Sequence, residues 1–146
     1  MSETDFLQEV VQDPIPADKN LRFLNLLVDT IAFYALAFLM GMVLGVLAPE
    51  IFLREELGSK LMLNLVTILL FVAYFGILEG LTKGKTLGKL LTGTRAVKLD
   101  GSPITFGDAF KRALSRVVPF EAFSGFADRP WHDSWTDTVV IKEIKN

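Results

Sequence analysis

The sequence predicts an all-α membrane protein: two transmembrane helices in an antiparallel hairpin, a cytoplasmic-side amphipathic or re-entrant helix, and a small β-hairpin element. Hydrophobic residues make up 51% of the 146 residues, and they are segregated from the charged residues along the chain. Two nearly uncharged runs each approach the roughly 20 residues that cross a hydrocarbon core. A soluble protein with a large core is the alternative.

The two apolar runs are predicted to form helices over about residues 21–48 and 61–80. Backbone groups in lipid have to bond to one another, and an α-helix achieves this within one segment. Pro49 follows the first run, and Glu79 closes the second. Because the connection over residues 49–60 is short, the two helices are predicted to be antiparallel neighbours.

Basic residues near the ends of the two runs predict the orientation of the chain. Lys19 precedes the first run, Arg22 lies at its very start, and several lysines follow the second. Since basic residues accumulate on the cytoplasmic side, both termini are expected there. Residues 1–20 then form an acidic cytoplasmic segment before a membrane domain over 21–146. This acidic start does not resemble a signal peptide.

The pattern after the second run changes to short alternation. Residues 94–99 alternate between apolar and polar side chains and lead into Asp100-Gly101, a strong turn signal. Residues 138–144 have the composition of a second strand. We expect the two segments to pair.

Residues 106–118 predict an amphipathic helix. One face is apolar, and the basic residues lie away from it. Such a helix is suited to the cytoplasmic interface, where Trp131 and Trp135 also favour the headgroup level. Residues 120–126 are too short to cross a bilayer alone.

Composition excludes several classes of function. The net charge of −2 argues against nucleic-acid binding. The absence of cysteine excludes disulfides, thiolate metal sites and a cysteine nucleophile, and one histidine excludes multi-histidine metal sites. Residues 82–89 lack the residue order of a phosphate-binding loop. We expect no metal, cofactor or catalytic residue, and no enzymatic activity.

Asp29 is the first candidate for a functional site. It lies about two turns into the first helix, where an ionisable group is costly and usually has a partner. Arg22, Asn25 and Asp29 share one helix face. One interpretation is a cation or proton site on this carboxylate. The other is a structural role, in which Arg22 and Asp29 hold the helical hairpin to the cytoplasmic segment through salt bridges.

Three further residues have similar alternatives. Glu79 ends the second helix and is either a ligand or an ordinary interfacial carboxylate within reach of the lysines that follow it. His132 and Asp133 are adjacent, but no nucleophile motif accompanies them, so a turn or charge partner is the alternative to catalysis. A separate group of basic residues is suited to anionic lipid headgroups. These candidates are Lys83, Lys85, Lys89, Lys111, Arg112 and Arg116.

The chain resembles the RDD family of bacterial membrane proteins from about residue 21 to residue 140. The resemblance rests on short motifs distributed along the chain. They are Leu21-Arg22-Phe23 with Asp29, Glu79-Gly80-Leu81-Thr82, Gly84-Lys85-Thr86-Leu87-Gly88-Lys89, Arg95-Ala96-Val97, Asp100-Gly101, Thr105-Phe106 with Arg112, Trp131-His132-Asp133 and Thr138-Val139-Val140. Asp137 departs from the pattern, since the family usually has glycine there.

The resemblance implies a multi-pass protein of the bacterial inner membrane. The arginine and two aspartates that name the family correspond here to Arg22, Asp29 and Asp133. Monovalent cation/proton exchange has been proposed for some members. Two helices cannot enclose a water-filled path, so exchange would need a homo-oligomer or a third segment in the bilayer.

Two functions therefore compete. The first is exchange of monovalent cations or protons. Its site candidates are Asp29, Arg22, Asn25, Glu79, Asp133 and His132. The second is a non-transporting module that binds anionic lipid, or a membrane partner, through its basic cytoplasmic face.

Overall fold

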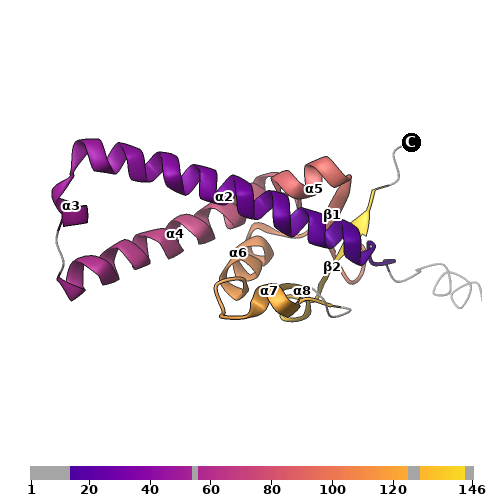
Figure 1. Cartoon of the computed structure of the whole chain (residues 1–146). Helices are drawn as coiled ribbons and strands as arrows, with labels where there is room; N and C mark the ends of the chain where they lie inside the picture. Colours follow the sequence, from indigo (N-terminus) through magenta and orange to yellow (C-terminus); the bar gives the residue numbers. More distant parts are fainter. Residues whose placement is uncertain (1–13, 54–55, 125–128, 144–146) are drawn as a thin grey trace, which may run out of the picture.

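The computed structural model describes residues 14–53, 56–124 and 129–143. Most of the predicted acidic segment lies outside these residues. Two long helices, α2 (Lys19–Leu47) and α4 (Leu57–Leu81), are joined through the short α3 (Glu50–Leu53). The remaining elements gather where α2 begins and α4 ends (Figure 1). We call this region the polar end.

Helices α2 and α4 are long and apolar enough to cross a membrane. Their bounds lie within a few residues of those predicted. Asp18 caps α2 by accepting a hydrogen bond from the backbone nitrogen of Asn20 at 3.2 Å. The two helices lie close at the polar end and diverge toward α3 (Figure 1). Most of their side chains outside the polar end are exposed, as expected for helices that face lipid.

Two close approaches attach the polar end to these helices. Gly88 of α5 (Leu87–Thr92) lies so near α2 that an added Cβ would be 2.5 Å from the carbonyl oxygen of Asn25. On α4, Gly76 and Gly80 leave room for the rings of Phe110 and Phe106 from α6 (Phe106–Ser115). Small residues therefore allow α5 and α6 to pack closely against α2 and α4.

Helix α6 starts where its sequence signals indicate and ends earlier than predicted. Thr105 and Asp108 form a reciprocal capping box at its start. The helix was expected to reach residue 118, but Arg116 is its C-cap. Its buried face includes Arg112, which the sequence placed away from the apolar face.

The β element consists of the two predicted segments, but it is not a β-hairpin. Strand β1 (Thr94–Lys98) pairs antiparallel with β2 (Thr138–Lys142), with Val97 opposite Val139. Asp100 and Gly101 do reverse the chain, but Pro103 and the α6 cap follow instead of a second strand. The chain reaches β2 only after α6, α7 (Glu121–Ser124) and α8 (Trp131–Ser134).

Candidate functional site

Glu79, near the end of α4, is the centre of a buried group of charges. Arg112 Nε lies 2.8 Å from one carboxylate oxygen of Glu79, and Arg116 Nη2 lies 3.3 Å from the other. Lys89 Nζ also contacts this carboxylate. No side chain of the group is more than 9% exposed. We call Glu79, Lys89, Arg112, Arg116 and Asp133 the Glu79 cluster.

Arg112 connects the Glu79 cluster to the C-terminal part of the chain. Its Nη1 donates hydrogen bonds to Asp133 of α8 and to the Thr138 hydroxyl of β2. Burial alone would lower the pKa of Arg112, but the Glu79 and Asp133 carboxylates outweigh burial and raise it. Arg112 thus stays charged and joins α4, α6, α8 and β2 through one side chain.

Lys89 is held less firmly in its charged form. Its side chain is 3% exposed, and burial lowers its pKa to about 8 against the opposing effect of Glu79. Arg112 and Arg116 add repulsion in the same direction as burial. The amine therefore depends on the Glu79 carboxylate to remain protonated in this position.

Asp29 is buried but makes hydrogen bonds rather than an ion pair. Its carboxylate accepts from the Thr86 hydroxyl at 2.6 Å and from the backbone nitrogen of Gly88 at 2.8 Å. Among the described residues, no lysine or arginine forms an ion pair with it. The carboxylate faces the start of α5, which supplies both donors. Asp29 is therefore attached to this segment by hydrogen bonds and not by the salt bridge that the structural interpretation expected.

Asn25 lies one turn before Asp29 and also faces α5. Its side-chain amide is within hydrogen-bond distance of the hydroxyls of Thr92 and Thr94, at 2.6 and 2.9 Å. With the amide oxygen toward Thr94, the nitrogen can also donate to the Gly88 carbonyl at 3.0 Å. Asn25 and Asp29 therefore attach α5 to α2.

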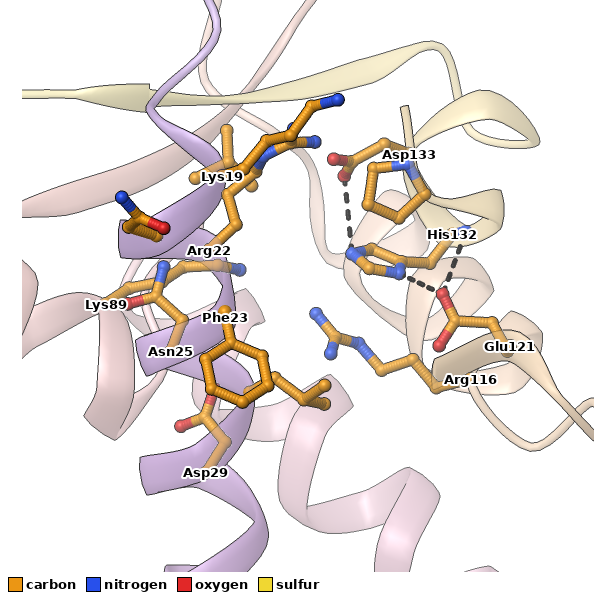
Figure 2. A pocket seen from close by; sticks show the side chains of 14 residues that line it. Lys19, Arg22, Phe23, Asn25, Asp29, Lys89, Arg116, Glu121, His132 and Asp133 are labelled. Carbon is orange, nitrogen blue, oxygen red and sulfur yellow. Dashed lines mark hydrogen bonds and ion pairs between the residues drawn. The ribbon is translucent and has the colours of Figure 1, made fainter. Parts of the chain in front are cut away.

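A cavity of about 330 Å³ lies between the start of α2 and the segment from α6 to α8 (Figure 2). Its wall combines cations, carboxylates and apolar side chains from distant parts of the sequence. The lining residues used below are Lys19, Arg22, Asp29, Lys89, Arg116, Glu121, His132 and Asp133. Asn25 also lines the cavity, which therefore brings together five of the six predicted ion-site residues. Glu79 lies behind Lys89 and Arg116.

His132 and Glu121 form the wall opposite α2. The ring Nδ1 contacts the Glu121 carboxylate, whereas Nε2 lies 3.6 Å from an oxygen of Asp133. Burial, and then the nearby Arg116 and Arg112, hold the pKa of His132 well below its usual value. The neutral ring therefore donates from Nδ1 to Glu121, because a carboxylate only accepts.

The six predicted headgroup candidates do not lie on one face. Lys89, Arg112 and Arg116 belong to the Glu79 cluster, and Lys85 pairs with Glu143 at 2.8 Å. Lys83 and Lys111 are exposed. Helical periodicity relates residues within one helix only, so it does not indicate which cations are buried against other elements.

The sequence interpretation did not single out three residues that shape the site. Lys19 was used only for orientation, Thr86 only for the family resemblance, and Glu121 was not considered. Glu121 follows Pro119 and Phe120 in an otherwise apolar stretch, which was a usable signal. A carboxylate in such a stretch usually has a partner, here His132.

Comparison with known proteins identifies the chain at the level of its family. The sequence model of the RDD family matches residues 17–140, which is most of the chain. The chain belongs to the RDD family. No curated protein and no solved structure gives a match. RDD membership and the two long apolar helices together indicate a membrane protein.

The three residues that the resemblance assigns to the RDD name converge in space. Arg22, Asp29 and Asp133 all line the cavity, although Asp133 lies more than 100 residues after Asp29 along the chain. These three positions therefore line one three-dimensional site.

Proposed function

We propose that this RDD protein binds an anionic amphiphile, the phosphate headgroup of a lipid, in the cavity at the polar end. In this proposal α2 and α4 cross the bilayer as a hairpin, and the polar end lies at the cytoplasmic interface. The basic residues around the polar end support this orientation. A ligand of this kind reaches the cavity from the adjacent leaflet.

The observation that carries the proposal is the state of Arg116. Its side chain is only 9% exposed, and Arg116 lines the cavity with its guanidinium group directed inward (Figure 2). The Nε atom is buried and has no hydrogen-bond partner among the described residues. A buried donor without an acceptor is costly, and a phosphate oxygen would satisfy it.

Other cations besides Arg116 also line the cavity. Four cations line it, Lys19, Arg22, Lys89 and Arg116, against the carboxylates of Asp29, Glu121 and Asp133. Glu79 and Arg112, directly behind the wall, add one charge of each sign. These basic side chains are the groups that would contact an anionic headgroup.

The size and the apolar part of the wall fit an amphiphile. About 330 Å³ lies at the lower end of the range for small-molecule sites. Phe23, Leu26, Pro130 and Val140 supply apolar surface beside the cations. A phosphate group can contact Arg116 while the glycerol or acyl part of the ligand lies against these side chains.

Lipid titration in nanodiscs tests the proposal. The protein is placed in phosphatidylcholine nanodiscs, and short-chain phosphatidic acid is added while the fluorescence of Trp131 and Trp135 is followed. Arg116→Gln should weaken binding about tenfold or more, because a hydrogen bond to a charged group contributes about 1.5–3 kcal/mol. Glycerol phosphate in a parallel titration distinguishes a lipid from a free phosphate ester.

Lys142→Gln is the matched control. Lys142 lies on β2, is exposed and loses the same charge. It should change the apparent affinity less than about twofold, since surface charges act weakly through water. Equal losses for both variants, or equal binding of phosphatidylcholine and phosphatidic acid, would contradict a specific site.

Exchange of a monovalent cation or proton is the second candidate function. One observation favours it: Asp29 is 2% exposed, lines the cavity and has no ion-pair partner among the described residues. A buried carboxylate with this surrounding can bind a proton or a small cation. The cations across the cavity oppose cation entry, so we place this function second.

Proteoliposomes test the exchange directly. An internal pH dye is followed while a sodium or potassium gradient is imposed. Asp29→Asn keeps the shape of the side chain and its bond to Thr86 but removes the charge. If Asp29 is the exchange site, the unaltered protein should give a flux and Asp29→Asn should abolish it. No flux, or the same flux from both proteins, would exclude Asp29 as the exchange site.

A further inference from the structure

The turn between α6 and α7 carries an apolar surface that no part of the described chain covers. We infer that this surface enters the inner leaflet and contacts lipid acyl chains, as a re-entrant element beside α4. We call it the turn surface, and it comprises Leu114, Pro119, Phe120 and Phe123. This inference concerns the position of the element in the bilayer and does not depend on a ligand in the cavity.

Contacts between α6 and α4 define the direction in which α6 runs. Phe106, the first residue of α6, lies against Gly80, and Phe110 lies against Gly76. Four residues forward on α6 thus correspond to four residues backward on α4. Helix α6 therefore runs antiparallel to α4, from the polar end toward the apolar part of α4.

Arg116 confirms this direction beyond the end of α6. Its guanidinium group lies 4.9 Å from the centre of the Phe75 ring, while it also reaches back to Glu79. If the same correspondence is extended along the helix axes, Leu114 lies level with residue 72, about 12 Å from Gly80 at 1.5 Å per residue. The hydrocarbon half of a bilayer is about 15 Å thick, so this end of α6 is level with the inner leaflet.

Figure 1 agrees with this register. The turn between α6 and α7 lies on the side of the polar end that faces α3, whereas the β strands lie on the opposite side. In the same view α6 lies between the turn and α4. The turn thus lies on the side of the polar end from which the apolar part of α4 extends.

The chemistry of the turn surface suits hydrocarbon. Phe120 is 74% exposed, Phe123 is 69% exposed and Leu114 is 58% exposed. Within residues 114–124 the charged side chains are Arg116 and Glu121, and both point inward to the cavity and its ion pairs. An exposed aromatic patch without exposed charge is unfavourable in water and favourable in lipid.

The charge pattern along α6 fits the same position. Lys111 is exposed one turn before Leu114, closer to the polar end. A lysine there can reach the phosphate level while the residues after it enter the hydrocarbon. The helix therefore changes from basic to apolar in the direction that its contacts with α4 define.

Site-directed spin labelling tests the insertion, because the chain contains no cysteine and single cysteines need no background removal. Phe120→Cys and Phe123→Cys are labelled separately in the full chain, reconstituted in vesicles of phosphatidylcholine and phosphatidylglycerol. Power saturation compares the accessibility of each label to oxygen, which concentrates in hydrocarbon, and to a nickel chelate, which stays in water. Both positions are exposed, so labelling leaves the packed interior intact.

Two control positions calibrate the measurement. Leu69→Cys lies on the exposed apolar surface of α4, and Asp100→Cys lies in the exposed turn after β1. We expect labels at Phe120 and Phe123 to favour oxygen, as at Leu69. If the labels at Phe120 and Phe123 favour the nickel chelate, as the label at Asp100 should, or are equally accessible to oxygen and the chelate, the insertion is wrong.

Discussion

Removing the charge of Glu79 is the sharpest test of how the polar end is held together. In Glu79→Gln, Lys89 and Arg116 lose the carboxylate with which they form ion pairs, and among the described carboxylates Arg112 keeps Asp133. Removing one member of a buried ion pair costs about 3–5 kcal/mol, because the remaining charge is left uncompensated. We expect the free energy of unfolding to fall by about this amount.

Reversible unfolding in mixed micelles of detergent and SDS measures the change. The fluorescence of Trp131 and Trp135 reports it, since both lie at or next to α8, which Arg112 joins to α4. Glu143→Gln is the matched control, because Glu143 forms ion pairs with Lys85 and Arg95 in a more exposed position. Exposed pairs contribute about 0–1 kcal/mol, so this variant should be nearly neutral.

A double-mutant cycle separates the pair energy from general disruption. Lys89→Met removes one of the cations that Glu79→Gln leaves uncompensated, so the double variant should lose less than the sum of the single changes. A coupling energy of about 0.5–3 kcal/mol is the usual range for residues in contact. Strict additivity, or a Glu79→Gln cost no larger than that of Glu143→Gln, would refute the assignment of Glu79 as the centre of the cluster.

Two further changes test the packing and the histidine. Gly88→Ala should destabilise by about 1–3 kcal/mol, because its Cβ would be forced against the Asn25 carbonyl; Gly41→Ala, with nothing within 4 Å, should be neutral or slightly stabilising in the same unfolding assay. His132 stays neutral in the folded chain, while the unfolded chain takes up this proton near its ordinary pKa of 6.5. The free energy of unfolding should therefore fall as the pH drops below this value, by up to about 1.4 kcal/mol per pH unit, and His132→Gln should remove that slope. His132 is the single histidine of the chain. If His132→Gln leaves the pH dependence of the free energy of unfolding unchanged, groups other than histidine cause it.

Helix caps and strand segments could be predicted from the sequence because their causes lie within one short segment of the chain. The Thr105–Asp108 capping box joins residues three apart, and the residues of β1 and β2 have the composition of strands. The predicted helix over residues 106–118 was less accurate at its end, where Arg116 turns back to Glu79. A tertiary contact decided that boundary.

The partners of the charged side chains could not be predicted in the same way. Helix periodicity places Arg22 and Asp29 on one face, and the structural interpretation expected both residues to form salt bridges with the cytoplasmic segment. Asp29 instead bonds to Thr86 and Gly88, which lie almost 60 residues later. The decisive factor is the close approach of α5 to α2, in which Gly88 lies against the backbone of Asn25. No local pattern in the sequence indicates that these two residues meet.

By itself, the sequence determined the two long apolar helices, their approximate ends, and the presence of charges that need partners. Each of these follows from hydrophobicity or hydrogen bonding within a continuous stretch of chain. Only the tertiary structure decided that Lys89, Arg112 and Arg116 meet at Glu79 and that Arg22, Asp29 and Asp133 line one cavity. Those meetings depend on which helix packs against which, and long-range packing has no local signature in the chain.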